Sequence, residues 1–249
     1  MNVQDEFMDN IYIDVKENIN SVMERVSKAA VRSGRKPETI KVIAVTKNVE
    51  PQRILEALST NIIQDLGENR VQELVKKYEI FSSNELYGKN INWHLIGHLQ
   101  SNKVKYIVDK VKMIHSLDSI KLAREINNRM ENIQSIMDVL VEVNVAEEET
   151  KFGIKTNEVE DFLAEIKDLK YIKVKGLMTI APKVPDPEEV RPVFRELKKI
   201  FIDISRKNID NIDMVYLSMG MSNDFEVAIE EGANIVRIGT SIFGKREYK

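Results

Sequence analysis

The amino-acid sequence predicts an α/β fold: a single (β/α)8 barrel of the TIM type, preceded by one extra N-terminal helix. Two observations lead to this prediction. Eight short apolar segments alternate with segments of helical periodicity, and the length of 249 residues is close to the usual size of such a barrel. No linker rich in Pro, Gly or Ser divides the chain, so we expect one domain over residues 1–249. An open, doubly wound sheet is the alternative, since a miscounted strand would separate the two folds.

The first element is a long amphipathic helix between residues 3 and 32. Its apolar positions follow the helical period, and they are Ile11, Val15, Ile19, Val22, Met23, Val26 and Ala30. Gly34 and Pro37 then end the helix. The next segment, residues 41–47, is apolar and rich in β-branched side chains, which predicts a buried strand that ends on Lys47.

From residue 51 onward, helices and strands alternate. Pro51 lies in a first helical turn, Ser101 is a plausible helix cap, and Asp186 with Pro187 forms a helix start. The expected helices are 51–58, 69–78, 102–108, 119–130, 156–169, 186–206 and 224–230. The expected strands after the first are 61–67, 91–97, 112–117, 138–145, 172–179, 213–218 and 235–239.

Composition excludes several classes of function. With 37 basic and 40 acidic residues the formal net charge is −3, so no basic field is available for nucleic acid or a membrane surface. The absence of cysteine excludes disulfides, thiolate metal sites and cysteine nucleophiles. The acidic N-terminal segment is not a secretory signal, and no apolar run approaches membrane-spanning length, so we expect a cytoplasmic protein.

The chemistry of a barrel lies at the C-terminal ends of its strands, where the sequence places a lysine and two loops rich in Gly and Ser. Lys47 follows an apolar strand, and desolvation there would favour the neutral amine that attacks an aldehyde, although a solvated surface cation is the alternative. The two loops after the seventh and eighth strands are a common place for phosphate, and their donor residues are Ser218, Gly220, Ser222, Gly239 and Thr240. Together these features suggest a phosphorylated carbonyl compound as ligand.

Arg237 and the three histidines complete the candidate residues. Arg237 lies two residues before Gly239 on the same strand face, so it could reach a ring or charge beside the phosphate, or form a structural ion pair. His98 lies in a loop on the functional face, whereas His94 and His115 lie within expected strands and are expected to be buried with partners. No H-E-x-x-H motif accompanies them, so we expect no metal site.

Six segments in order along the chain, from about residue 10 to 246, resemble the pyridoxal phosphate homeostasis proteins. They are 44–47 (A-V-T-K), 67–73 (G-E-N-R-V-Q-E), 93–103 (W-H-L-I-G-H-L-Q-S-N-K), 176–178 (G-L-M), 217–222 (L-S-M-G-M-S) and 236–244 (V-R-I-G-T-S-I-F-G). The resemblance implies a barrel like the N-terminal domain of alanine racemase, with pyridoxal 5'-phosphate (PLP) as its cofactor. Asn48 and Arg70 depart from the residues common in that family, at positions that would affect only the rim of the pocket.

The resemblance also implies a role for each cofactor-binding residue. Lys47 would hold PLP as an internal aldimine, and Arg237 would face the pyridine nitrogen and weaken the ring as an electron sink. Ser218, Gly239 and Thr240 would hold the phosphate with Ser222 nearby, while Asn69 and His98 would line the pocket.

The expected function is therefore PLP homeostasis: a monomer that holds the cofactor and buffers or supplies it to apoenzymes, without robust catalysis. The resemblance implies a further contrast: alanine racemases take a tyrosine base from a second domain, and we expect no such domain here. A weak racemase-like enzyme remains one alternative. A class I aldolase-like barrel acting on a phosphorylated sugar is the other.

Overall fold

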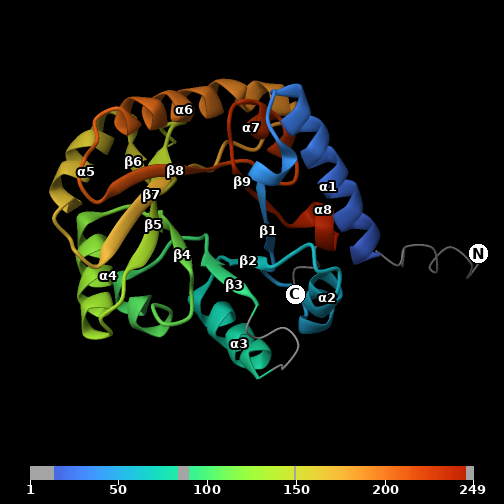
Figure 1. The fold of residues 1–249 in the computed structure, drawn as a ribbon, viewed down its shortest axis with the longest axis horizontal. Helices are drawn as coiled ribbons and strands as arrows, with labels where there is room; N and C mark the ends of the chain where they lie inside the picture. The colour runs from blue at the N-terminus through green and yellow to red at the C-terminus, as the bar shows by residue number, and fades with distance from the viewer. Residues whose placement is uncertain (1–13, 84–89, 149, 245–249) are drawn as a thin grey trace, which may run out of the picture.

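Eight parallel strands pair side by side in a ring that closes on itself, in a computed structural model that describes residues 14–83, 90–148 and 150–244 (Figure 1). The ring runs β1 (Lys41–Val45), β2 (Asp65–Glu68), β3 (Asn92–Leu95), β4 (Met113–Leu117), β5 (Met137–Asn144), β7 (Ile172–Met178), β8 (Ile212–Ser218) and β9 (Ile235–Ile238). It closes where β9 pairs with β1, with Lys41 opposite Ile235. The predicted barrel is confirmed, and the open sheet is excluded.

Helices surround the ring on its outer side (Figure 1). They are α1 (Val15–Arg32), α2 (Pro51–Leu58), α3 (Val71–Ser82), α4 (Ile120–Asn132), α5 (Val159–Ile166), α6 (Arg191–Ser205), α7 (Phe225–Glu230) and α8 (Thr240–Phe243). Short 3-10 turns occur at η1 (Pro37–Thr39), η2 (Ser101–Tyr106), η3 (Thr156–Glu158) and η4 (Pro187–Val190). None of the described helices is long and apolar enough to cross a membrane.

The structure differs most clearly from the predicted elements in three places. The helix expected at 102–108 is the 3-10 turn η2, and its N-cap is Gln100, without a side-chain hydrogen bond, instead of Ser101. The two-residue strand β6 (Ile154–Lys155), which pairs with β5 outside the ring, was not predicted. The four-residue helix α8 was not predicted either, because neither element is long enough to show a periodic pattern.

Helix α1 is the extra N-terminal helix, and it packs against α7 and α8 (Figure 1). It begins after Asp14, whose carboxylate accepts a hydrogen bond of 2.7 Å from the backbone N–H of Lys16. Residues Val15, Ile19, Val22, Val26 and Ala30 are buried, as their spacing predicts. Residues 3–13 of the expected helix lie outside the described residues.

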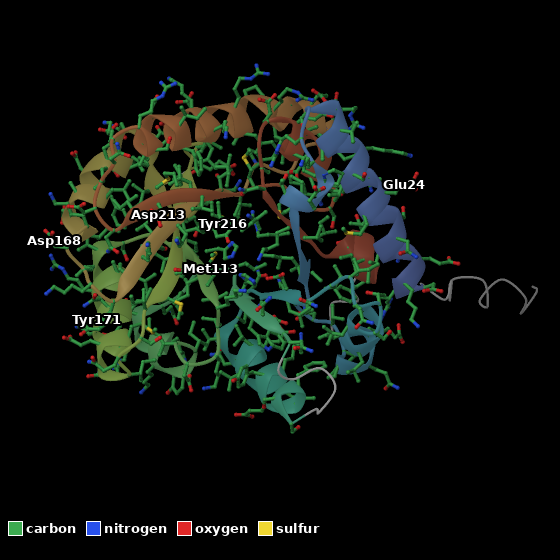
Figure 2. All side chains as sticks on the ribbon, in the orientation of Figure 1. Glu24, Met113, Asp168, Tyr171, Asp213 and Tyr216 are labelled. Atoms are coloured by element: carbon green, nitrogen blue, oxygen red, sulfur yellow. The ribbon has the colours of Figure 1, made fainter. Side chains whose placement is uncertain are left out.

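The apolar core has two parts. The larger part fills the layer between the strands and the helices. A small separate cluster lies inside the ring, where Met113, Leu140 and Met178 pack with Ile180 and Tyr216. Figure 2 shows Met113 and Tyr216 within the ring of strands, whereas Glu24 and Asp168 lie outside it. Much of the remaining lumen is occupied by polar side chains, from which the site is built.

Gly176 on β7 has no room for a side chain. Its φ is +146°, and an added Cβ would lie 1.8 Å from the backbone oxygen of Tyr216 on β8. We expect Gly176→Ala to lower the free energy of unfolding, measured with urea, by about 3 kcal/mol or more. Gly34→Ala is the control, because its φ is +69° but no atom lies within 4 Å, so only a backbone cost of about 1 kcal/mol is expected. Equal losses in the two variants would contradict this account.

Candidate functional site

The predicted site residues follow five strands that are consecutive in the ring. Asn69 follows β2, His98 follows β3, and Lys47 follows β1. The segments 218–222 and 237–240 lie at the ends of β8 and β9. The order of these strands is β3-β2-β1-β9-β8, and all of them are parallel. Their C-terminal ends therefore meet at one edge of the barrel, which is the functional edge of this fold.

Lys47 is half-buried, and its amine makes no hydrogen bond or ion pair with any residue that the structure describes. The two residues beside it are held by a buried ion cluster on β2 and α3, formed by Glu68, Glu73 and Lys77. The Lys77 amine donates to the Thr46 carbonyl at 2.5 Å, to Glu68 at 2.6 Å and to Glu73 at 2.7 Å.

The two carboxylates of this cluster also bind the residues on either side of Lys47. Glu68 accepts the Thr46 hydroxyl at 2.6 Å, and Glu73 accepts the backbone N–H of Asn48 at 2.6 Å. Glu68 is fully buried, and burial raises the pKa of its carboxyl, although the Lys77 cation opposes that rise. The cluster therefore fixes the backbone on both sides of Lys47 and leaves its amine unengaged. Sequence reasoning missed Lys77, because a lysine on a helix is usually a surface charge.

The loops after β8 and β9 are joined through Ser222. Its hydroxyl oxygen accepts the backbone N–H groups of Gly239 and Ser241, each at 3.2 Å, so its own O–H remains available as a donor. Asp224 holds the same loop by accepting the Met221 N–H at 2.6 Å. Thr240 is exposed beside them, at the start of α8. The structure thus places Ser222, Gly239 and Thr240 together, in an arrangement suited to an anion.

Arg237 is buried beneath these loops and is held at two points. Its guanidinium donates to the Ser218 hydroxyl oxygen at 2.6 Å and to the Thr179 carbonyl at 2.8 Å. Burial lowers the pKa of Arg237 to about 10, so the side chain stays a cation at neutral pH. Ser218 is itself fully buried, and its hydroxyl is used within the lumen instead of facing the loops. The alternative of an ion pair is not what holds this guanidinium, since both of its hydrogen-bond partners among the described residues are neutral oxygens.

Inside the lumen, Ser218 connects to both strand histidines. His115 Nδ1 lies 3.1 Å from the Ser218 hydroxyl, and His115 Nε2 lies 3.1 Å from His94 Nδ1. His94 Nε2 lies 2.8 Å from an Asp65 carboxylate oxygen, which also pairs with Lys41 at 3.4 Å. The prediction that His94 and His115 are buried with partners is confirmed.

Asn69 and His98 line a hollow of about 490 Å³ next to the start of α3. The other lining residues are Arg70, Val71, Gln72, Gln100 and Lys103. His98 is fixed by a 2.8 Å hydrogen bond to Asp118 and by stacking on Phe152, with ring centroids 3.7 Å apart. Lys47 is not among the residues that line this hollow. Within the described ranges, no group of His, Asp or Glu side chains could hold a metal ion.

Glu142 on β5 is a buried carboxylate that sequence reasoning missed. The signal was an acidic residue in the middle of the apolar segment 139–145, V-L-V-E-V-N-V. Four buried oxygens at this edge have no hydrogen-bond partner among the described residues, and they belong to Glu142, Asn144, Asn69 and Glu68, whose other carboxylate oxygen binds Lys77. Buried polar atoms are nearly always satisfied, so these oxygens call for donors from a ligand or from water.

The charge of Glu142 should make stability depend on pH. Burial raises its pKa from 4.5 to about 7, and Asp118 adds to the rise while Arg237 opposes it. A raised carboxyl pKa gives stability that is complete below the unfolded pKa and is lost as pH rises through about 7. Glu142→Gln keeps the neutral form, so we expect its unfolding free energy to exceed the wild-type value by up to roughly 3 kcal/mol at about pH 8 and to match it at about pH 4.

Urea unfolding at the two pH values checks this expectation. Glu147→Gln, on the exposed turn after the same strand, is the matched control and should show no such pH-dependent gain. A Glu142→Gln variant that is less stable than the wild type at the higher pH would show that the ionised carboxylate is paired in the folded protein.

Comparison with known proteins agrees with the geometry. A family model described as alanine racemase, N-terminal domain, matches residues 15–247. A protein of Aquifex aeolicus (strain VF5) named pyridoxal phosphate homeostasis protein is 46% identical over 232 residues, which are 93% of this chain and 98% of that protein. The protein of the same name from Escherichia coli (strain K12) is 36% identical over 237 residues, which are 94% of this chain and 98% of that protein.

Solved structures give the same barrel. The structure of PipY of Synechococcus elongatus, described as having PLP bound, superimposes with a TM-score of 0.78 and 28% identity, covering 92% of this chain and 100% of that chain. Alanine racemase of Corynebacterium glutamicum is 12% identical with a TM-score of 0.66, covering 91% of this chain and 62% of that chain, so that likeness concerns the fold alone.

Proposed function

The chain belongs to the family of pyridoxal phosphate homeostasis proteins, and on that premise we propose that it binds PLP through a Schiff-base link to Lys47 and serves as a store of the cofactor. The observation that carries this proposal is the Lys47 amine. Lys47 is half-buried, its amine is free of partners among the described residues, and the ion cluster holds the backbone of its neighbours Thr46 and Asn48. An unengaged amine on a fixed backbone is what a carbonyl-binding lysine requires.

The other residues fit the rest of the cofactor. An aldehyde would meet Lys47, and a phosphate would meet the hydroxyls of Ser222 and Thr240. Gly239 would contribute by positioning Ser222, to which its backbone N–H donates. Ser218 would contribute to cofactor binding indirectly, by anchoring Arg237, because the Ser218 hydroxyl is already hydrogen-bonded inside the lumen. Asn69 and His98 would line the pocket, and the partnerless oxygens of Asn69 and Glu142 offer acceptors for hydrogen-bond donors on the ligand.

Arg237 supports a storage role over catalysis. A permanent cation facing the ring nitrogen would keep that nitrogen unprotonated, and the ring would then be a poor electron sink. Bound PLP would supply electron withdrawal, and the Arg237 cation beside its ring nitrogen would reduce that withdrawal. We propose a cytoplasmic, monomeric protein that keeps free PLP low and passes it to apoenzymes.

The test is an absorbance titration with PLP, followed by borohydride reduction and peptide mass mapping. We expect one pyridoxyl group per chain, on Lys47. The loaded protein should then restore the activity of a PLP-dependent apoenzyme, and amino acids should not be turned over. A pyridoxyl label spread over many surface lysines would refute specific binding, and sustained racemisation would replace storage with an enzymatic role.

A further inference from the structure

Five side chains cross the barrel lumen in one continuous row of hydrogen bonds: Arg237, Ser218, His115, His94 and Asp65. The row begins beneath the glycine loops, near the C-terminal ends of the strands. It ends at Asp65, the first residue of β2, at the opposite end of the barrel. Each member comes from a different strand, namely β9, β8, β4, β3 and β2. The four contacts lie between 2.6 and 3.1 Å.

The two ends of the row fix its direction. A guanidinium can only donate, so Arg237 donates to the Ser218 oxygen. An ionised carboxylate can only accept, and the hydrogen bond from His94 with the nearby Lys41 cation holds the pKa of Asp65 below its ordinary value against the effect of burial. Burial lowers the pKa of both histidines, so each is neutral and carries one N–H.

The hydrogen positions then follow one from another. Because Asp65 accepts, His94 carries its hydrogen on Nε2, and its bare Nδ1 must accept from His115. His115 therefore also carries its hydrogen on Nε2, and its bare Nδ1 must accept from the Ser218 hydroxyl. With its hydrogen directed at His115, the Ser218 oxygen presents lone pairs to Arg237.

We propose that Asp65 is a positioning residue for the site at the opposite end of the barrel: acting through His94 and His115, it orients the Ser218 hydroxyl and so fixes Arg237. The role of Arg237 toward a cofactor rests on the function proposed above, whereas the direction of the row is a property of the protein alone. If the row ran the other way, His115 Nδ1–H would donate to the Ser218 oxygen and compete with Arg237 for its lone pairs, which would weaken one of the two anchors of Arg237.

The tautomers can be read directly, because the chain has only three histidines. In ligand-free protein labelled with nitrogen-15 histidine, long-range proton–nitrogen correlation spectra report which ring nitrogen carries hydrogen. His98→Gln removes the signals of the exposed ring and assigns the two buried ones. We expect the Nε2–H tautomer for both His94 and His115 near neutral pH. An Nδ1–H tautomer or an imidazolium at either position would overturn the inference.

The variant Asp65→Asn tests whether the Asp65 carboxylate sets the direction of the hydrogen bonds along the row. The amide can either accept from His94 or donate to it, so both directions become possible, and we expect an Nδ1–H population of roughly one tenth or more. Asp109→Asn is the matched control, because Asp109 is exposed and pairs with Lys110, and its spectrum should equal that of the wild type. An unchanged spectrum in folded Asp65→Asn protein would overturn the inference, and the wild-type spectrum decides it if this variant does not fold.

The PLP dissociation constant distinguishes a positioning role of Asp65 from a purely structural one. We expect Asp65→Asn to raise the PLP dissociation constant on the order of tenfold, as for a weakened hydrogen bond to a charged group, with Lys47 still the labelled residue. A changed tautomer with an unchanged dissociation constant would refute the positioning role. Failure of the wild type to bind PLP would refute the proposed function, and the ligand-free spectra would still decide the direction of the row.

Discussion

Replacing Lys47 with alanine should abolish the pyridoxyl adduct completely. The Lys47 amine is the one that the site leaves unengaged, and no other described lysine shares its place at the end of β1. The phosphate contacts would remain, so weak non-covalent binding of PLP could persist without the absorbance band of the lysine link. Absorbance titration and peptide mass mapping after borohydride reduction measure the result.

This loss should not come from unfolding. The amine of Lys47 has no hydrogen-bond partner among the described residues, so we expect Lys47→Ala to change the unfolding free energy by less than about 1 kcal/mol. Lys28→Ala is the control, because Lys28 is an exposed lysine of α1 paired with Glu24, and it should keep the full adduct. Persistence of the adduct in Lys47→Ala protein would place the carbonyl-binding amine elsewhere.

Replacing Lys77 with methionine should be the most destabilising of the changes considered, lowering the unfolding free energy by about 3–5 kcal/mol. The substitution keeps the side-chain volume but removes the cation that pairs with Glu68 and Glu73. Glu68 is fully buried, so its carboxylate would keep the Thr46 hydroxyl but lose its compensating cation. The Thr46 carbonyl would also lose its 2.5 Å donor, which should loosen the backbone at Lys47 and slow adduct formation.

A double variant sharpens this prediction. Glu68→Gln removes the buried negative charge that Lys77→Met leaves without a cation. The double variant should therefore be more stable than Lys77→Met alone. Lys28→Met breaks a fully solvated pair of α1 and should cost less than about 1 kcal/mol. If Lys77→Met costs no more than Lys28→Met in urea unfolding, the cluster does not hold the Lys47 segment.

The sequence predicted the barrel well, because the elements of a parallel barrel leave strong local patterns. The strand expected at 138–145 is β5 at Met137–Asn144, and the helix expected at 51–58 is α2 with the same bounds. The prediction of an α-helix at 102–108 was wrong because a 3-10 turn and one turn of α-helix bury side chains at similar spacings. Elements of two or four residues, such as β6 and α8, are below the length at which periodicity can be read.

The site was only partly predictable. The loops after β1, β8 and β9 could be placed together, because a parallel barrel brings the ends of its strands to one edge. The engagement of Ser218 in the lumen depends on His115, which is 103 residues away in sequence, and no local pattern reports such a contact. Glu142 and Lys77 are charged residues in apolar surroundings, which is a readable signal, but their partners are set by packing.

The pairing of β1 with β9 has a consequence for how the protein matures. Strand β1 leaves the ribosome early, yet one of its two neighbours in the ring is synthesised about 190 residues later. Lys47 and the loops at 218–222 and 239–241, which form the proposed site, come from these two ends of the chain, so we expect that a nascent chain that lacks β9 does not capture the ligand. Uptake of the ligand would therefore report completed folding, and until then the apolar edge of β1 must be kept from other chains.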